Sequence, residues 1–221
     1  MRDFSEIPKT KLFRNLTDDE IRQLVRHTSY FISSFKKGAE IFPPDSPISH
    51  SGIILSGEID VMHLSLSGDE ELVGRNRTGD IIAPAFCITG IENNLSHFRA
   101  AKDSEILFLD IHSLLAHPVN ESFYSKFIAN LTTILATNNI ILNRKIQLLT
   151  QKSLSKKLMT YFMQLSRESK SRTFRLSFTR EQLAQYISSE RSSVCRELGR
   201  LQDDGLIRVN GNEITILEPV G

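Results

Sequence analysis

The segment from residue 120 to residue 149 constrains the fold most, because it contains neither glycine nor proline. It reads NESFYSKFIANLTTILATNNIILNRKIQLL, with apolar side chains at helical spacing, which predicts one long helix. Two overlapping stripes of side chains run along this helix. The first contains Phe127, Leu131, Ile134, Asn138 and Ile141, and the second contains Tyr124, Ile128, Leu131, Leu135 and Leu142.

Two stripes on one long helix need two surfaces to cover them. One stripe can pack on the preceding part of the chain, and the other stays in water unless a second subunit supplies the same helix. We therefore expect a homodimer, with Asn138 as the polar position that sets the register of the pair. The alternative is a monomer in which one wide stripe faces the core. We assign the dimer interface to Phe127, Leu131, Ile134, Asn138 and Ile141.

The sequence before this helix is broken into short β-prone pieces by glycines and prolines. Their regular spacing predicts an antiparallel roll or sandwich of roughly eight strands. The clearest hairpin has its turn at the Ser-Gly-Asp of residues 67–69. A short opening helix is predicted after Thr17, because Thr17 and Glu20 have the spacing of a capping box. The chain is therefore expected to be of the α+β class.

The stretch TREQLAQYISSERSSVCRELGRL, residues 179–201, predicts two helices joined by a tight turn. Thr179 and Gln182 form a second capping-box pair at the start of the first helix. Ser188 and Ser189 offer the break and the cap of the second helix. An Asn-Gly pair at residues 210–211 then predicts a β hairpin.

The second of these helices has two different sides. Val194, Leu198 and Leu201 fall on one side and are expected to be buried, whereas the opposite side carries hydroxyls, arginines and Gly199. A helix-turn-helix with such an outer face and a following hairpin suits the major groove, because arginine and serine can bond to base edges or phosphates. Residues 151–221 carry a net charge of +4 against −3 for residues 1–150, which also favours phosphate contact. We expect DNA contacts from Thr179, Arg180, Ser189, Arg191, Ser192, Ser193, Arg196 and Arg200.

The composition excludes several classes of protein. With 40% hydrophobic and 24% charged residues, the chain is neither collagen-like nor disordered. No signal-like start and no apolar run of membrane length is present, so we expect a cytoplasmic protein without a membrane partner. Cys87 and Cys195 are too few for an all-cysteine metal site within one chain. No nucleophile–base set, metal cluster or phosphate loop is recognisable, so we expect no enzyme activity and identify no metal or cofactor.

Together these features resemble the Crp–Fnr family of bacterial transcription regulators over nearly the whole chain. The resemblance rests on LFRNLTDDEI, GAEIF, LSGEIDV, RTGDII, the long helix, the stretch 179–201 and DDGLI. The family order implies a cyclic-nucleotide-binding-like β roll at residues 1–119, a dimerisation helix at 120–150 and a winged helix-turn-helix domain at 151–221. It also implies a homodimer that binds double-stranded DNA and that contacts RNA polymerase if it is an activator.

In the family members that bind cyclic AMP, particular residue pairs hold the ribose and the phosphate, and this chain departs from them. Those members carry a Gly-Glu pair just after the Gly-Asp turn and an Arg-Ser pair further on, whereas here Gly79–Asp80 is followed by Ile-Ile-Ala-Pro. Burying a phosphodiester without a cationic partner is costly, so we do not expect cyclic AMP in the usual pose. The remaining possibilities are that the roll binds a neutral or differently charged effector, or that it binds no effector. The positions assigned to it are Ile82, Ala83, Pro84, Asn94, Leu95 and Leu142.

Other departures from the family concern sensing and DNA sequence. No cysteine precedes Cys87, so the iron–sulfur sensor of the family is not expected, and the six histidines are scattered singly without indicating a haem ligand. Cys87 itself is either a redox sensor or a small buried hydrophobe, and the second interpretation is favoured. Ser192 stands where many members carry a glutamate that accepts from cytosine N4, which predicts a changed half-site.

A rival function belongs to a different class. The chain would then be a regulatory module that binds a cyclic nucleotide or another small ligand and acts through protein contacts. Nucleotide binding without retention on DNA would favour this rival over a DNA-binding regulator.

Overall fold

The computed structural model describes residues 10–43, 45–64, 70–91, 96–118 and 121–217. The chain divides into two compact units, Met1–Asn139 and Ile140–Gly221. The boundary falls within the long helix, so the segment 120–150 that we expected between the two domains is shared by both units.

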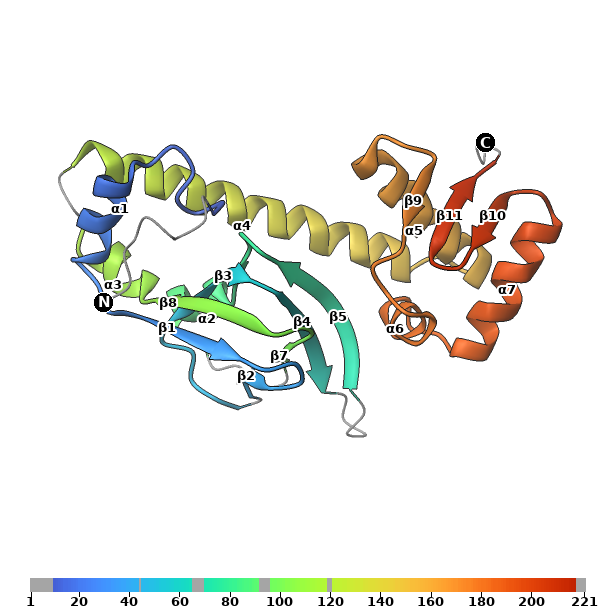
Figure 1. The fold of residues 1–221 in the computed structure, drawn as a ribbon, viewed down its shortest axis with the longest axis horizontal. Helices are drawn as coiled ribbons and strands as arrows, with labels where there is room; N and C mark the ends of the chain where they lie inside the picture. Colours follow the sequence, from blue (N-terminus) through green and yellow to red (C-terminus); the bar gives the residue numbers. More distant parts are fainter. Residues whose placement is uncertain (1–9, 44, 65–69, 92–95, 119–120, 218–221) are drawn as a thin grey trace. The chain divides into compact units, whose positions relative to one another are not determined.

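The first unit contains three short helices, the strands of the roll and the beginning of the long helix (Figure 1). In chain order these are α1 (Asp18–Val25), β1 (Tyr30–Phe35), β2 (Glu40–Phe42), β3 (Ser51–Ser56), β4 (Glu58–Leu64), β5 (Glu70–Arg77), β6 (Ile81–Ile82), α2 (Pro84–Thr89), β7 (Ser96–Ala100), β8 (Ser104–Leu109), α3 (Ile111–Ala116) and the first part of α4 (Ser122–Leu149). The second unit contains the rest of α4, α5 (Leu154–Ser169), β9 (Thr173–Arg175), α6 (Arg180–Tyr186), α7 (Arg191–Asp203), β10 (Ile207–Asn210) and β11 (Glu213–Ile216).

Two antiparallel sheets of four strands each form the roll, in the orders β1-β8-β3-β6 and β2-β7-β4-β5. The predicted roll of roughly eight strands is therefore confirmed in the described residues. Ile53 and Ile106 of one sheet and Ile59 and Phe98 of the other belong to the same buried cluster, so the two sheets enclose one core. The hairpin of β4 and β5 is present, and its predicted turn at residues 67–69 lies outside the described residues.

The glycine of the LSGEIDV motif is required by the turn between β3 and β4. Gly57 has a φ of +93°, in the region that side chains rarely adopt. A Cβ atom at this position would also collide with the hydroxyl of Ser104. Any larger residue would therefore disturb the junction of the two sheets.

The first part of α4 is fixed to the N-terminal segment by polar contacts. The Nζ of Lys126 lies 2.7 Å from Glu20 Oε1, and this contact holds the pKa of Glu20 below its ordinary value. Asn130 donates from Nδ2 to the carbonyl oxygens of Leu12 and Arg14, at 3.0 and 2.7 Å. Glu20 also completes the predicted capping box of α1 with Thr17.

The structure corrects the assignment of the two stripes of α4. Phe127, Leu131 and Ile134 are 0%, 3% and 8% exposed and belong to the core of the chain's own roll. They are therefore unavailable to a partner, because their side chains are already covered. Of the other two residues assigned to the interface, Asn138 is half-buried and Ile141 is 51% exposed.

The second stripe is only partly covered by the chain: it shares the buried Leu131 with the first stripe, and its Tyr124 also packs against the core. Ile128 and Leu135 are half-buried at the margin of the core, and Leu142 is 56% exposed. The sequence showed two overlapping stripes that share Leu131, but not which of them faces the roll. That choice depends on how α4 docks on the roll.

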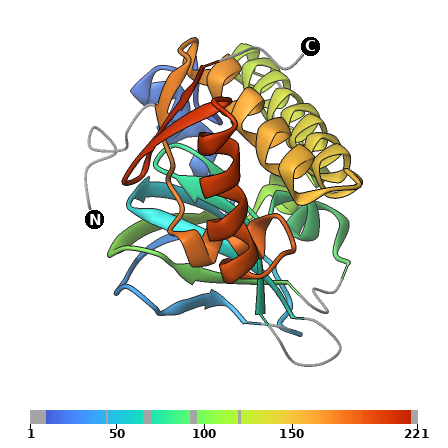
Figure 2. The same cartoon turned by 90° about the vertical axis from the view of Figure 1, so that its right-hand side faces the viewer.

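In the second unit, α5, α6 and α7 pack with a three-stranded sheet of order β10-β11-β9. Leu158 and Phe162, which lie one turn apart on α5, are fully buried. The hairpin of β10 and β11 lies beside α7 (Figures 1 and 2). The predicted hairpin is present, but its turn is shifted by one residue: Asn210 ends β10 and pairs with Glu213, so Gly211 and Asn212 form the turn.

Two further features concern the described residues as a whole. None of their helices is long and apolar enough to cross a membrane. Their histidine, cysteine and carboxylate side chains form no group of three or more that could hold a metal ion.

Candidate nucleic-acid interface

Helix α6 begins where the sequence predicted it. The hydroxyl of Thr179 accepts a hydrogen bond from the N–H of Gln182 at 3.2 Å, and Gln182 Oε1 accepts one from the N–H of Thr179 at 3.1 Å. This reciprocal pair is the expected capping box. Leu183 and Ala184 are buried, so the inner face of α6 is fixed against the rest of its unit.

The turn between α6 and α7 differs from the prediction. We expected Ser188 and Ser189 to supply the break between the helices and the cap of α7. The break lies at these residues, but the N-cap of α7 is Glu190, whose side chain makes no capping hydrogen bond. Ser188 has a φ of +50°, and the N–H groups of Ser188 and Ser189 donate to the carbonyls of Gln185 and Ala184 at 3.1 and 3.0 Å. Both serines therefore close α6 rather than open α7. A pair of serines between two helices is compatible with either role, so its spacing did not decide between them.

Helix α7 has the predicted buried side and exposed face. Val194, Leu198 and Leu201 are at most 4% exposed. The exposed residues of α7 are Arg191, Ser192, Cys195, Arg196, Gly199 and Arg200, with Gln202 and Asp203 in the last turn, and Ser193 is half-buried beside them. This face offers hydroxyls, guanidinium groups and an uncovered glycine, which suit the donors, acceptors and close approach of a DNA groove.

The three arginines of α7 differ in their present partners. Arg191 lies 4.0 Å from Glu181, and Arg200 lies 3.9 Å from Glu197 and 3.7 Å from Asp204; both arginines are largely exposed, and such pairs are weak in water. Arg196 has its Nη2 atom 3.3 Å from the hydroxyl of Ser193, and no carboxylate of the described residues pairs with it. Among the residues that the structure describes, Arg196 is therefore the arginine of this face whose charge is least compensated.

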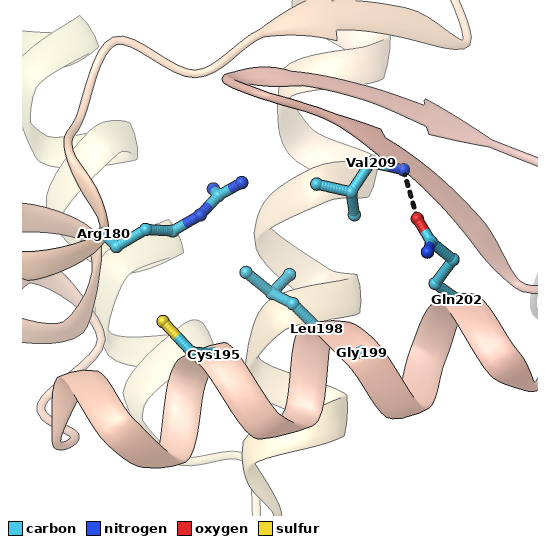
Figure 3. Close-up of a pocket in the computed structure, with 6 residues that line it drawn as sticks. All are labelled: Arg180, Cys195, Leu198, Gly199, Gln202 and Val209. Carbon is cyan, nitrogen blue, oxygen red and sulfur yellow. Dashed lines mark hydrogen bonds between the residues drawn. The ribbon is translucent and has the colours of Figure 1, made fainter.

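Arg180 contacts the wing formed by β10 and β11. Its Nη2 atom donates to the carbonyl of Gly211 at 2.6 Å, and its Nη1 atom is buried. On the other side, Gln202 of α7 accepts a hydrogen bond from the N–H of Val209 at 2.9 Å. Figure 3 shows Arg180 and Gln202 on opposite sides of a cavity of about 270 Å³ between α7 and the wing. The cavity is lined by Arg180, Cys195, Leu198, Gly199, Gln202 and Val209.

The residues predicted to contact DNA therefore fall into two groups. Those of α7 lie together on its exposed side, whereas Thr179, Arg180 and Ser189 lie at the start and the end of α6. Arg180 holds the wing with one of its nitrogens, a contact that sequence reasoning missed along with Gln202 and Cys195. The contact of Gln202 with the wing could have been suspected from the sequence only because a long polar side chain stands in the last turn of a helix that precedes a hairpin.

The residues assigned to an effector lie in different surroundings. Ile82 and Ala83 are 1% and 6% exposed and belong to the core of the roll, and Pro84 begins α2. Asn94 and Leu95 lie outside the described residues. Leu142 belongs to the second unit and is exposed.

The turn before Ile82 is fixed by contacts within the chain. Asp80 accepts from the Nζ of Lys11 at 2.5 Å and from the N–H of Arg77 at 2.8 Å. The nearby thiol of Cys87 is 3% exposed and donates to the carbonyl of Ser49 at 3.3 Å. Burial of this kind is typical of a structural cysteine rather than of a redox sensor.

A β roll, a long helix and a winged helix-turn-helix with an uncovered serine and arginine face define the class of the protein: a two-domain DNA-binding transcription regulator. Residues 32–116 match the Cyclic nucleotide-binding domain, and residues 156–221 match the Crp-like helix-turn-helix domain. The chain belongs to the Crp/Fnr family.

Two curated relatives match most of the chain. Electron transport regulator A of Shewanella oneidensis is 25% identical over 188 residues, which cover 83% of this chain and 73% of the relative. The fumarate and nitrate reduction regulatory protein of Escherichia coli is 27% identical over 189 residues, covering 82% of this chain and 72% of the relative. Both are regulators by name.

Solved structures of the same fold extend over nearly the whole chain. The c-di-GMP-responsive global regulator of Xanthomonas campestris has a TM-score of 0.71 at 16% identity, covering 92% of this chain and all of the other. A regulator of the same family from Eubacterium rectale has a TM-score of 0.63 at 20% identity, with 97% and 95% covered. At such identities the likeness establishes the fold.

Proposed function

We propose that this regulator binds DNA as a homodimer, with α7 of each copy in a major groove. The observation that carries the proposal is the division of α7 between its buried Val194, Leu198 and Leu201 and its exposed face around Arg196. Arg196 would contact a base edge or a phosphate, with the other arginines and serines of α7 beside it. Thr179, Arg180 and Ser189 would approach the backbone from the two ends of α6.

Pairing of α4 with the α4 of a second copy would complete the dimer. Ile128, Leu135 and Leu142 recur every seven residues, the repeat that places side chains in the seam of a coiled coil. Leu142 and Ile146, one turn apart, are 56% and 58% exposed. Exposure of apolar side chains to water is unfavourable, and the same helix of a second copy would bury these side chains. A two-fold dimer would present two copies of α7 to an inverted repeat.

The input to the roll is proposed to be something other than cyclic AMP in its usual pose. The solved relative from Xanthomonas campestris is described as responsive to c-di-GMP, and the matched domain is named for cyclic nucleotides. In this chain the positions after Asp80 carry hydrocarbon side chains, and Ile82 and Ala83 are buried in the core. An effector of other chemistry would act by binding one arrangement of the dimer better than the other. The regulator would work in the cytoplasm, and as an activator it would contact RNA polymerase.

A binding assay with Arg196→Ala tests the proposed role of α7. The probe is a labelled duplex that the wild-type protein has selected from random DNA, with a scrambled duplex for comparison. Loss of one specific arginine contact should weaken binding to the selected duplex by about tenfold or more. Arg167→Ala removes the same charge from the exposed surface of α5 and should bind like the wild type. Wild-type affinity in the Arg196→Ala variant would refute the assignment.

A further inference from the structure

The end of α6 leaves two carbonyl groups without a backbone donor. A helix ends with unpaired carbonyls, and each of them needs a partner where it is buried. The carbonyls of Leu183, Ala184 and Gln185 accept from the N–H groups of Ile187, Ser189 and Ser188, respectively. Among the backbone hydrogen bonds of the described residues, none reaches the next two carbonyls, those of Tyr186 and Ile187.

Two lysines from other helices bind these two carbonyls. Lys145 of α4 donates from Nζ to the carbonyl of Tyr186, and the same ammonium group lies 3.1 Å from the centre of the Tyr186 ring. Lys157 of α5 donates from Nζ to the carbonyl of Ile187 at 3.2 Å. Both side chains are half-buried. The C-terminal end of a helix carries partial negative charge, so cations at this place stabilise it.

The residue that follows these carbonyls has an unfavourable backbone conformation. Ser188 has a φ of +50°, at the position where a helix that ends in this way usually carries glycine. A side chain makes the left-handed conformation costly, so the turn persists only if its surroundings hold it. The two carbonyls that the lysines bind lie immediately before Ser188. The conformation at Ser188 sets the direction in which α7 leaves α6.

We propose that Lys145 and Lys157 are positioning residues for DNA recognition. Their ammonium groups hold the end of α6 and the strained turn at Ser188, and thereby fix the orientation of α7 without touching DNA themselves. Lys145 lies on α4, so a rotation of this part of α4 would withdraw its ammonium group from the turn. The inference rests on the proposed reading of DNA by α7.

Lys145→Met and Lys157→Met test the inference with the full-length protein and the selected duplex. Each variant removes the ammonium group and keeps a long apolar chain. Each variant should bind the selected duplex about tenfold more weakly, because α7 would then adopt several orientations instead of the one that the lysine fixes. The dependence of affinity on salt should keep the wild-type slope, since a lysine that does not contact phosphate releases no counterion. Adding Ser188→Gly to Lys145→Met should restore most of the affinity, because glycine adopts the turn without strain.

The controls separate this inference from the function on which it rests. Lys156→Met removes the same charge from an exposed neighbour on α5 and should bind like the wild type. Unchanged affinity in both lysine variants, a salt slope reduced by about one per lysine, or a loss that Ser188→Gly does not restore would each overturn the inference. If Arg196→Ala loses binding while both lysine variants keep it, the proposed function stands and the positioning role fails. Circular dichroism checks that each variant is folded. If Lys145→Met does not fold, the affinity of Lys157→Met tests the inference on its own.

Discussion

The side-chain oxygen of Gln202 accepts a hydrogen bond from the N–H of Val209 across 2.9 Å, which joins the last turn of α7 to the first strand of the wing. Gln202→Leu should lower the unfolding free energy of the second unit by about 1 kcal/mol, the usual worth of such a bond. Amide exchange at Val209 should become faster. Gln202→Glu keeps an acceptor at the same place and should retain the protection, whereas wild-type exchange in Gln202→Leu would show that the wing is held by other contacts.

The proposed dimer surface can be tested by placing a charge in the open stripe of α4. Leu142→Glu puts a carboxylate where two helices would meet, and a buried unpaired charge is strongly unfavourable. Sedimentation should therefore show a dimer for the wild type and a monomer for Leu142→Glu. Ala136→Glu, at an exposed position on another face of the helix, should remain dimeric. A monomeric wild type, or a dimeric Leu142→Glu, is incompatible with this interface.

Cyclic AMP should neither bind nor stabilise the protein. The hydrocarbon side chains after Asp80 offer no cation to a phosphodiester. Isothermal titration with cyclic AMP should give no heat of binding, and the melting temperature should not move. The selected duplex is the positive control, because any ligand of the folded state raises its melting temperature. If the melting temperature rises with the concentration of cyclic AMP, groups outside the Gly79–Pro84 segment bind the nucleotide, and this prediction is wrong.

Ser192 should determine part of the preferred DNA sequence. It is exposed in the first turn of α7, where a glutamate could accept a hydrogen bond from cytosine N4. Ser192→Glu should shift the selected half-site towards a C·G pair at one position and leave the other positions unchanged. Sequencing of the pools selected by the two proteins measures this shift, and identical pools would place Ser192 away from the bases.

Features that depend on neighbouring residues could be predicted from the sequence. The capping boxes at Thr17 and Thr179 join residues three apart, and the buried side of α7 follows from helical periodicity alone. The roll followed from the regular spacing of turn residues. The capping boxes and the buried side of α7 depend on local geometry, so neighbouring residues are enough to predict them. The spacing of turn residues predicts the strands of the roll but not their long-range pairing, such as that of β1 with β8.

Features that depend on docking could not be predicted. Which stripe of α4 faces the roll is decided by the fit of Phe127 and Ile134, which belong to the first stripe only, into the core of the roll. Arg180 reaches a carbonyl 31 positions away, and Lys145 reaches one 41 positions away, so neither contact has a local signal. The break at Ser188 and Ser189 was predicted correctly, but the cap of α7 was misassigned to them, because the cap of one helix and the end of another have similar sequences.

The central claim is that α7 reads DNA as part of a two-fold dimer, and selection of bound sites from random DNA tests it most directly. The wild-type protein should enrich an inverted repeat whose half-site centres lie about one helical turn, some 10 base pairs, apart. The Arg196→Ala protein, carried through the same rounds, should enrich no such repeat. A wild-type pool without an inverted repeat, or the same repeat enriched by both proteins, would contradict the account.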